Sequence, residues 1–184
     1  MSSRLDAGVE LLERSLGYTR TALARVGPTD LTRRTPCERW DLAALLAHMD
    51  DALEAFLEAA GGSVSVHPST PGDVAGLCAK ACTLLGVWSS PRTRPVDVGG
   101  VELDAEVLLG TAALEITVHG WDVATAVGMD HRIPTGLAAA LLPWARLLRL
   151  QAPFGRPVPT PDDAPPDVRL LAAVGRVSPT RRSR

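Results

Sequence analysis

Aromatic residues are scarce in this sequence: phenylalanine, tyrosine and tryptophan together make up 4% of its 184 residues. A hydrophobic core must therefore be built mainly from leucine, alanine and valine, since apolar residues still account for 46% of the chain. Leucine and alanine are strong helix formers, whereas aromatic and β-branched residues favour strands. The composition thus predicts a helical protein, and the length suffices for one domain with a substantial core.

The sequence also lacks an excess of charge of either sign. Its formal net charge is −2, and Lys80 is the only lysine among 19 basic residues. A strongly basic face is the usual electrostatic mark of proteins that bind nucleic acids or anionic membranes. We therefore expect neither nucleic acid nor membrane as a partner.

Long apolar runs and a cysteine framework are missing as well. No apolar run approaches the roughly 20 residues that a membrane-spanning helix requires. The N-terminal segment MSSRLDAGVELLERSLG carries acidic residues at helical spacing, so we do not expect a signal peptide. The three cysteines, Cys37, Cys78 and Cys82, are an odd count that argues against a disulfide framework. These features favour a cytoplasmic protein.

Apolar residues recur at helical spacing in five segments bounded by glycine, proline or capping residues. The expected helices cover residues 4–26, 41–60, 72–88, 105–127 and 135–150. Alternating valines around Gly99-Gly100 predict a small β-hairpin, and Pro143 predicts a kink in the fifth helix. Six of the fifteen prolines fall within residues 152–166, which favours an extended arm before a last short helix.

We therefore expect an all-α protein. Residues 1–150 would form an up-and-down four-helix bundle with an extra C-terminal helix and the small hairpin. Residues 151–184 would form a Pro-rich arm and a short terminal helix packed on the bundle. The sequence leaves open whether this bundle is a monomer or a homodimer.

The segment LEITVHGWD places a carboxylate and an imidazole, Glu115 and His119, four positions apart in an otherwise apolar helix. Side chains at this spacing project from one helix face with Cβ atoms about 5–6 Å apart. Both can therefore reach one metal ion at about 2.0–2.2 Å. A buried carboxylate without a partner is costly, and a cation would compensate its charge. The alternative is a helical Glu–His pair without a metal.

A third candidate ligand, His48, lies beside the apolar stripe of the helix at residues 41–60, among alanines that leave room around its ring. Taken alone, it is better explained as a boundary histidine with one hydrogen bond to a neighbouring helix. With Glu115 and His119 it completes two imidazoles and a carboxylate, which leaves one zinc position open, as in catalytic sites. Iron, nickel and manganese accept the same ligands, so zinc is favoured without being fixed.

Two neighbours of His119 are candidates for supporting roles. Asp122 could accept a hydrogen bond from a ligand imidazole or a bound water, a supporting role in catalysis. Its alternative is a partly exposed aspartate near the helix end. Trp121 is most simply a core residue or the wall of a cofactor pocket.

Other polar or sulfur-bearing residues carry weaker signals. Cys78 and Cys82 lack a nearby histidine and favour core packing, and Cys37 is expected to be buried. His67 and His131 are expected to be solvated in loops. We find no glycine-rich phosphate loop, no G-x-S-x-G motif and no nicotinamide fingerprint.

Two stretches, TPCERWDLAALLAHM and EITVHGWDVATAVG, resemble the DinB-like superfamily, in the branch of mycothiol-dependent maleylpyruvate isomerase N-terminal domains and their metal-binding relatives. The closing stretch APFGRPVPTPDDAPPDVRLLAAVGR is similar to the tail of short single-domain members. The resemblance implies an up-and-down four-helix bundle that binds a divalent metal, usually zinc. The implied ligands are His48, Glu115 and His119.

The resemblance also implies thiol chemistry. Characterised relatives use the metal to activate a low-molecular-weight thiol, such as mycothiol or bacillithiol, because a metal-bound thiol ionises near neutral pH. The maleylpyruvate isomerase carries a further C-terminal domain, so the resemblance supports metal binding more than that one reaction. We expect an S-transferase or isomerase that acts on an electrophilic small molecule. The alternatives are a non-catalytic metal- or ligand-binding protein of the same fold and a purely structural bundle.

Overall fold

The computed structural model describes residues 2–37, 40–61, 74–89, 96–98, 101–148 and 154–177. Within these ranges the chain forms six α-helices and a short 3-10 helix at Pro28–Asp30. The α-helices are α1 (Ser2–Leu23), α2 (Leu42–Gly61), α3 (Val74–Trp88), α4 (Ala105–Ala126), α5 (Thr135–Leu148) and α6 (Pro166–Ala173). The helical class predicted from the composition is confirmed.

The chain divides into two compact units, Met1–His131 and Arg132–Arg184. The first contains α1 to α4 and two short strands, and the second contains α5 and α6. The strands β1 (Val96–Val98) and β2 (Val101–Leu103) pair antiparallel, with Val98 opposite Val101. The boundary expected from the sequence, at residue 150, falls one helix later than this division.

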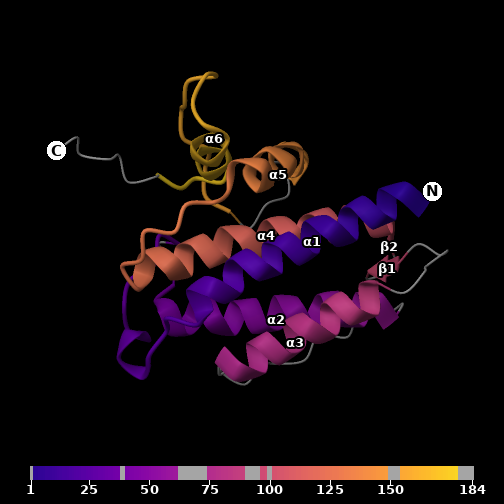
Figure 1. Ribbon diagram of the computed structural model, residues 1–184, viewed down its shortest axis with the longest axis horizontal. Helices are drawn as coiled ribbons and strands as arrows, with labels where there is room; N and C mark the ends of the chain where they lie inside the picture. The colour runs from indigo at the N-terminus through magenta and orange to yellow at the C-terminus, as the bar shows by residue number, and fades with distance from the viewer. Residues whose placement is uncertain are drawn as a thin grey trace. The chain divides into compact units, whose positions relative to one another are not determined.

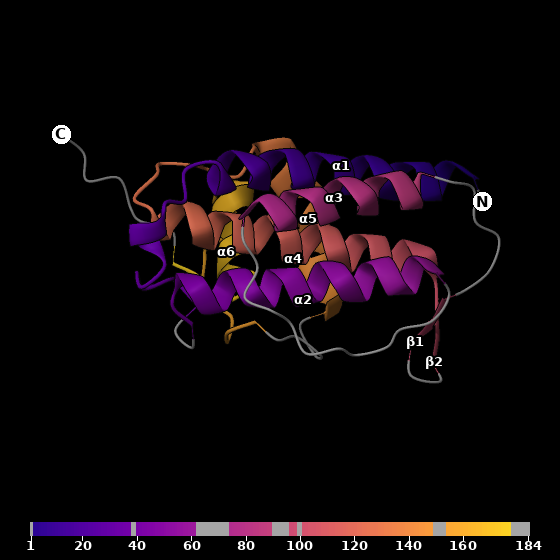
Figure 2. The ribbon, with the colours of Figure 1, turned by 90° about the horizontal axis from the view of Figure 1, so that it is seen from below.

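Helices α1 and α4 run side by side in the same direction (Figures 1 and 2). Near the start of both helices Gly8 faces Leu109, and further along both Thr19 faces Gly120. The hydroxyl of Thr19 donates a hydrogen bond to the carbonyl oxygen of Ile116 at 2.7 Å. A Cβ atom at Gly120 would lie only 2.9 Å from Cβ of Thr19. Glycine at this position therefore lets the two backbones approach closely.

Helices α2 and α3 are also parallel neighbours. Lys80 of α3 bonds to Asp50 of α2 at 2.9 Å, and further along both helices the indole of Trp88 donates to the carbonyl of Phe56 at 3.3 Å. The expected up-and-down order is therefore wrong for this pair, because successive helices in that order alternate in direction. Helix α2 spans 20 residues, or about 30 Å, and residues 62–73 can bridge about 40 Å when extended. The connection is thus long enough to return to the other end.

A capped loop sets the start of α2 beside the end of α4. The carboxylate of Asp41 accepts a hydrogen bond from the backbone N–H of Ala44 at 2.9 Å, which confirms its predicted place at the helix N-terminus. Just upstream, the guanidinium of Arg33 donates to the carbonyl of Ala126, in the last turn of α4, at 3.2 Å. The opening turns of α2 therefore lie near the closing turns of α4, where the candidate ligands occur.

Helix α4 is unusually buried for a helix that carries several polar residues. Every residue from Ala112 to Ala124 is buried, including Glu115, His119 and Asp122. The core of the first unit is built from leucines of all four helices: Leu12, Leu45, Leu46, Leu77, Leu84 and Leu109. The expectation of a core built mainly from leucine, alanine and valine is confirmed, with leucine and alanine making up most of it.

The second unit is held by polar as well as apolar contacts. Helices α5 and α6 pack together, and Asp167 at the start of α6 accepts from Arg132 at 2.7 Å. In the described part of the proline-rich segment, the N–H of Val158 donates to the carbonyl of Ala172 at 2.8 Å. None of the helices in the described ranges has both the length and the apolarity needed to cross a membrane.

Candidate metal centre

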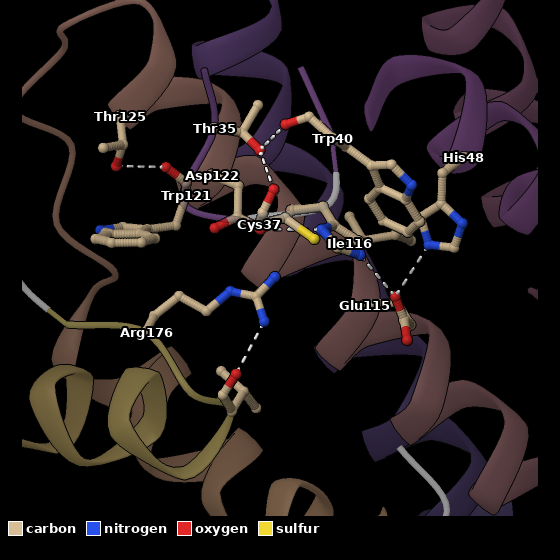
Figure 3. A network of polar contacts seen from close by, with 12 residues as sticks. Thr35, Cys37, Trp40, His48, Glu115, Ile116, Trp121, Asp122, Thr125 and Arg176 are labelled. Atoms are coloured by element: carbon tan, nitrogen blue, oxygen red, sulfur yellow. Dashed lines mark hydrogen bonds and ion pairs between the residues drawn. The ribbon is translucent and has the colours of Figure 1, made fainter. Parts of the chain in front are cut away.

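The three residues singled out as metal ligands come together in the first unit. Helix α2 supplies His48, and α4 supplies Glu115 and His119 from adjacent turns. Figure 3 shows the imidazole of His48 and the carboxylate of Glu115 pointing toward each other. One ligand atom from each of the three residues lies within 4.8 Å of the other two. The group therefore could hold a metal ion.

The distances between the ligand atoms suit a small divalent ion. Oε2 of Glu115 lies 3.0 Å from Nε2 of His119 and 3.8 Å from Nε2 of His48. Two ligands bound at about 2.1 Å in tetrahedral geometry are about 3.4 Å apart. The observed separations bracket this value, so small side-chain adjustments would bring all three atoms to bonding distance. The two imidazole rings are nearly perpendicular, at 85°, with centroids 5.0 Å apart.

Two of these atoms lack the hydrogen bonds that buried polar atoms normally make. Nε2 of His48 and Oε2 of Glu115 are both buried, and neither has a well-aligned hydrogen-bond partner among the described residues. The 3.0 Å contact between Glu115 and His119 is an ion-pair distance without hydrogen-bond alignment. Buried polar groups are costly to leave unsatisfied. A cation bound between the two atoms would satisfy both.

The charges of the cluster reinforce one another. Burial by itself would raise the pKa of Glu115, but the imidazoles of His119 and His48 outweigh it and lower that pKa to about 2. Burial would likewise lower the pKa of His119, but the carboxylates of Asp122 and Glu115 raise it above its usual value. The metal-free site therefore keeps an ionised carboxylate and favours a proton on His119.

The structure places Asp122 directly behind His119. Oδ2 of Asp122 lies 3.1 Å from Nδ1 of His119, and the aspartate is fully buried. This arrangement leaves Nε2 of His119 facing Glu115. A carboxylate in this position orients a ligand imidazole and raises its basicity. The alternative of a partly exposed aspartate is wrong.

Trp121, expected as core or pocket wall, is buried near the end of α4. Its carbonyl accepts a hydrogen bond from the hydroxyl of Thr125 at 2.9 Å. It is not among the described residues that line the cavity next to the cluster. The structure therefore places Trp121 in the core.

Trp40 is a neighbour of the site that the sequence did not reveal. Its indole packs against the ring of His48 in a tilted arrangement, with centroids 4.3 Å apart and planes 31° apart (Figure 3). It also lies 6.0 Å from the ring of His119. The hydroxyl of Thr35 donates a hydrogen bond to the carbonyl of Trp40 at 2.8 Å. This bond fixes the backbone of Trp40 in the loop before α2. In the sequence, the indication of this role was that a tryptophan lies two residues before the helix that carries the candidate ligand His48.

A cavity of about 240 Å³ adjoins the cluster, and Glu115 and His119 contribute to its lining. Cys78 and Cys82 of α3 also line it. The expectation that both pack in the core is wrong for Cys82, which is exposed. Cys37 is buried as expected.

The remaining two histidines lie apart from the cluster or outside the described residues. The ring of His131 stacks on Tyr18, with centroids 4.3 Å apart, and its carbonyl accepts from the Tyr18 hydroxyl at 2.8 Å. His131 does lie in a loop, as expected, but it is half-buried against Tyr18 and not fully solvated. His67 lies outside the described residues.

Comparison with known proteins gives relatives but no family. No family model matches the sequence, and no solved structure matches it. The chain is similar to "Uncharacterized protein MT0763" of Mycobacterium tuberculosis strain CDC 1551 / Oshkosh and to "Uncharacterized protein Rv0738" of strain H37Rv. Each is 27% identical over 164 residues, which cover 84% of this chain and 89% of the relative. The similarity thus extends over most of both chains.

Proposed function

We propose that this protein is a zinc-dependent enzyme that activates a low-molecular-weight thiol, such as mycothiol, for reaction with an electrophilic small molecule. His48, Glu115 and His119 would hold the zinc ion. The observation that carries the proposal is the pair of buried atoms, Nε2 of His48 and Oε2 of Glu115, that face each other without aligned hydrogen bonds. The reaction would be an S-transfer or an isomerisation.

The resemblance to the DinB-like superfamily supports the thiol part of this proposal. The two stretches that carry it contain His48 in one and both Glu115 and His119 in the other. We propose that α1 to α4 correspond to the four helices of that superfamily's bundle, with α2 and α3 parallel instead of alternating in direction. The paired strands would be an addition at the start of α4. The segment from residue 151 would then be the proline-rich tail of its short members.

A bound zinc ion would supply Lewis acidity, which lowers the pKa of a thiol or water. The residues of the chain would position the ligand histidine and exclude water. The carboxylate of Asp122 would accept a hydrogen bond from Nδ1–H of His119 and keep that ring in place. The adjoining cavity would exclude water from the electrophile. In an S-transfer, the thiol loses its proton to solvent and a sulfur–carbon bond forms. The leaving group then departs with the electron pair of its broken bond.

Metal analysis tests the site. Wild type, His48→Ala and His119→Ala are purified, loaded with zinc and dialysed, and His131→Ala serves as the control outside the cluster. We expect about one zinc per chain in wild type and the control, and a large loss in both ligand variants. Thermal melts of the metal-free proteins check that each variant folds. Equal, negligible zinc in all four proteins would reject the site.

Thiol consumption tests the reaction. Zinc-loaded and metal-free protein are compared for the consumption of mycothiol with 1-chloro-2,4-dinitrobenzene, with chloride release as the second readout. We expect acceleration by the zinc-loaded protein, which is lost in His48→Ala. Zinc binding without any acceleration would favour the non-catalytic binding protein instead.

A further inference from the structure

The cavity beside the candidate metal centre is small and mostly apolar. Its volume of about 240 Å³ is below the usual range for sites that bind drug-sized ligands. Its walls come from all four helices of the first unit and include Leu16, Leu23, Leu53, Phe56, Leu77 and Ile116. A ligand that fills this space must be small and must present apolar groups over most of its surface.

Four ionisable groups besides the cysteines belong to the lining. Glu115 and His119 come from the cluster, and Glu13 and Arg20 come from α1. Arg20 is exposed and forms no ion pair with any described residue. Its positive charge nevertheless acts on Cys78, on the α3 side of the cavity. Burial and the neighbouring Cys82 raise the pKa of the Cys78 thiol, and the guanidinium of Arg20 opposes them. Among the described residues, Arg20 is thus a cation in the cavity lining without an ion-pair partner.

The position of Arg20 along α1 sets it level with the cluster. It follows Thr19, which contacts the turn of α4 between Ile116 and Gly120. Glu13 lies seven residues earlier, about 10 Å away along the helix axis. An anionic group near Arg20 would therefore be level with the cluster along α1 and two helical turns from the opposing charge of Glu13.

We propose that the cavity binds a small apolar molecule with one anionic group, such as a carboxylate, paired to Arg20. The apolar part would lie against the leucines and Phe56, and the end nearest α4 would lie beside Glu115 and His119. This inference rests on the proposed function for what the ligand does there, namely serve as the electrophile. The binding itself does not require the metal. It is therefore tested on metal-free protein.

The experiment compares two probes of similar size, 4-phenylbutyrate and the neutral 4-phenylbutanol, by isothermal titration calorimetry. We expect wild type to bind the carboxylate about tenfold more tightly than the alcohol, because a charge-assisted pair is formed only with the anion. Arg20→Ala should lower the carboxylate affinity about tenfold and leave the alcohol unchanged. Arg25→Ala removes an exposed arginine that does not line the cavity, and it should change neither affinity.

A second variant tests the cavity. Ala81→Phe places a large side chain in the lining and should abolish binding of both probes, with zinc binding retained. If circular dichroism shows that Ala81→Phe is unfolded, Ala52→Leu serves as the cavity-filling variant, since Ala52 also lines the cavity. Equal affinity of wild type for the two probes, no effect of Arg20→Ala, or no binding of either probe would each overturn the inference. Loss of the metal site alone would leave these results unchanged, so the two proposals fail separately.

Discussion

Nδ1 of His119 lies 3.1 Å from Oδ2 of Asp122, one turn further along the same buried helix. The contact determines which nitrogen of the imidazole faces Glu115, because the other nitrogen is taken by the aspartate. A histidine so held has less rotational freedom to lose when it binds a metal. In the proposed metal site, Asp122 would thus contribute without supplying a ligand atom.

The first prediction concerns this aspartate. Asp122→Asn should weaken zinc affinity about 10–100-fold, the usual effect of removing the carboxylate partner of a ligand histidine. A chromogenic chelator that competes for zinc measures the loss. Asp130→Asn changes the same residue type at an exposed position outside the cluster and should have no effect. Unchanged affinity in Asp122→Asn would show that the aspartate is merely structural.

The second prediction concerns Trp40, whose ring contact we expect to position His48. Trp40→Ala should weaken zinc binding about three- to tenfold, because contact between aromatic rings contributes about 0.5–1.5 kcal/mol. Trp40→Phe retains an aromatic ring and should restore most of the affinity. If alanine and phenylalanine have the same effect on zinc affinity, the ring contact with His48 does not order the site.

The third prediction concerns protons released on zinc binding. Because the pKa of His119 is raised, this imidazole holds its proton at pH values where a free histidine has lost it. Zinc must displace that proton, so affinity should rise with pH until the pH exceeds the raised pKa. Calorimetry at pH 7 in two buffers of different ionisation enthalpy measures the protons released. No release at pH 7 would contradict the raised pKa.

The fourth prediction concerns acid stability of the metal-free protein. The pKa of Glu115 is lowered from 4.5 to about 2, so the ionised carboxylate stabilises the fold at pH values above 4.5. This contribution, on the order of 3 kcal/mol, should disappear as the pH falls from about 4.5 to about 2. Urea titrations of wild type and Glu115→Gln over this range measure it. Parallel pH profiles for the two proteins would contradict the prediction.

The fifth prediction concerns the contact between α1 and α4. Gly120→Ala should destabilise the protein by about 1–3 kcal/mol, because the new Cβ would overlap Thr19 and overpacking has costs of this size. Gly86→Ala is the matched control, since no atom lies within 4 Å of a Cβ at that helical position. It should stabilise the protein by about 0.5–1 kcal/mol. Urea titrations distinguish the two signs.

The sequence was sufficient to predict the helices and the candidate ligands because both depend on spacing along the chain. Glu115 and His119 are one turn apart, so any helix places them on one face. His48 was a weaker prediction, since its meeting with α4 depends on tertiary packing. The supporting position of Asp122 followed from its spacing to His119.

Other features depended on the path of the chain through space and could not be predicted from local pattern. Trp40 reaches His48 because the preceding loop is bonded to itself and to the end of α4. The stack of His131 on Tyr18 joins residues that are far apart in sequence. The parallel course of α2 and α3 depends on a long connection rather than on any motif. Turn and helix signals do not encode such contacts.

The parallel pairing of α1 with α4 has a consequence for the order of folding. The first and last helices of this unit must meet, so their contacts join residues about a hundred positions apart and form late compared with local structure. The candidate metal ligands come from the same two parts of the unit, with His48 on an early helix and the other two on the last. A chain that has not yet made α4 therefore has no site. Zinc would bind only the completed unit. It would therefore stabilise the folded unit by mass action, after α4 has packed against the other helices.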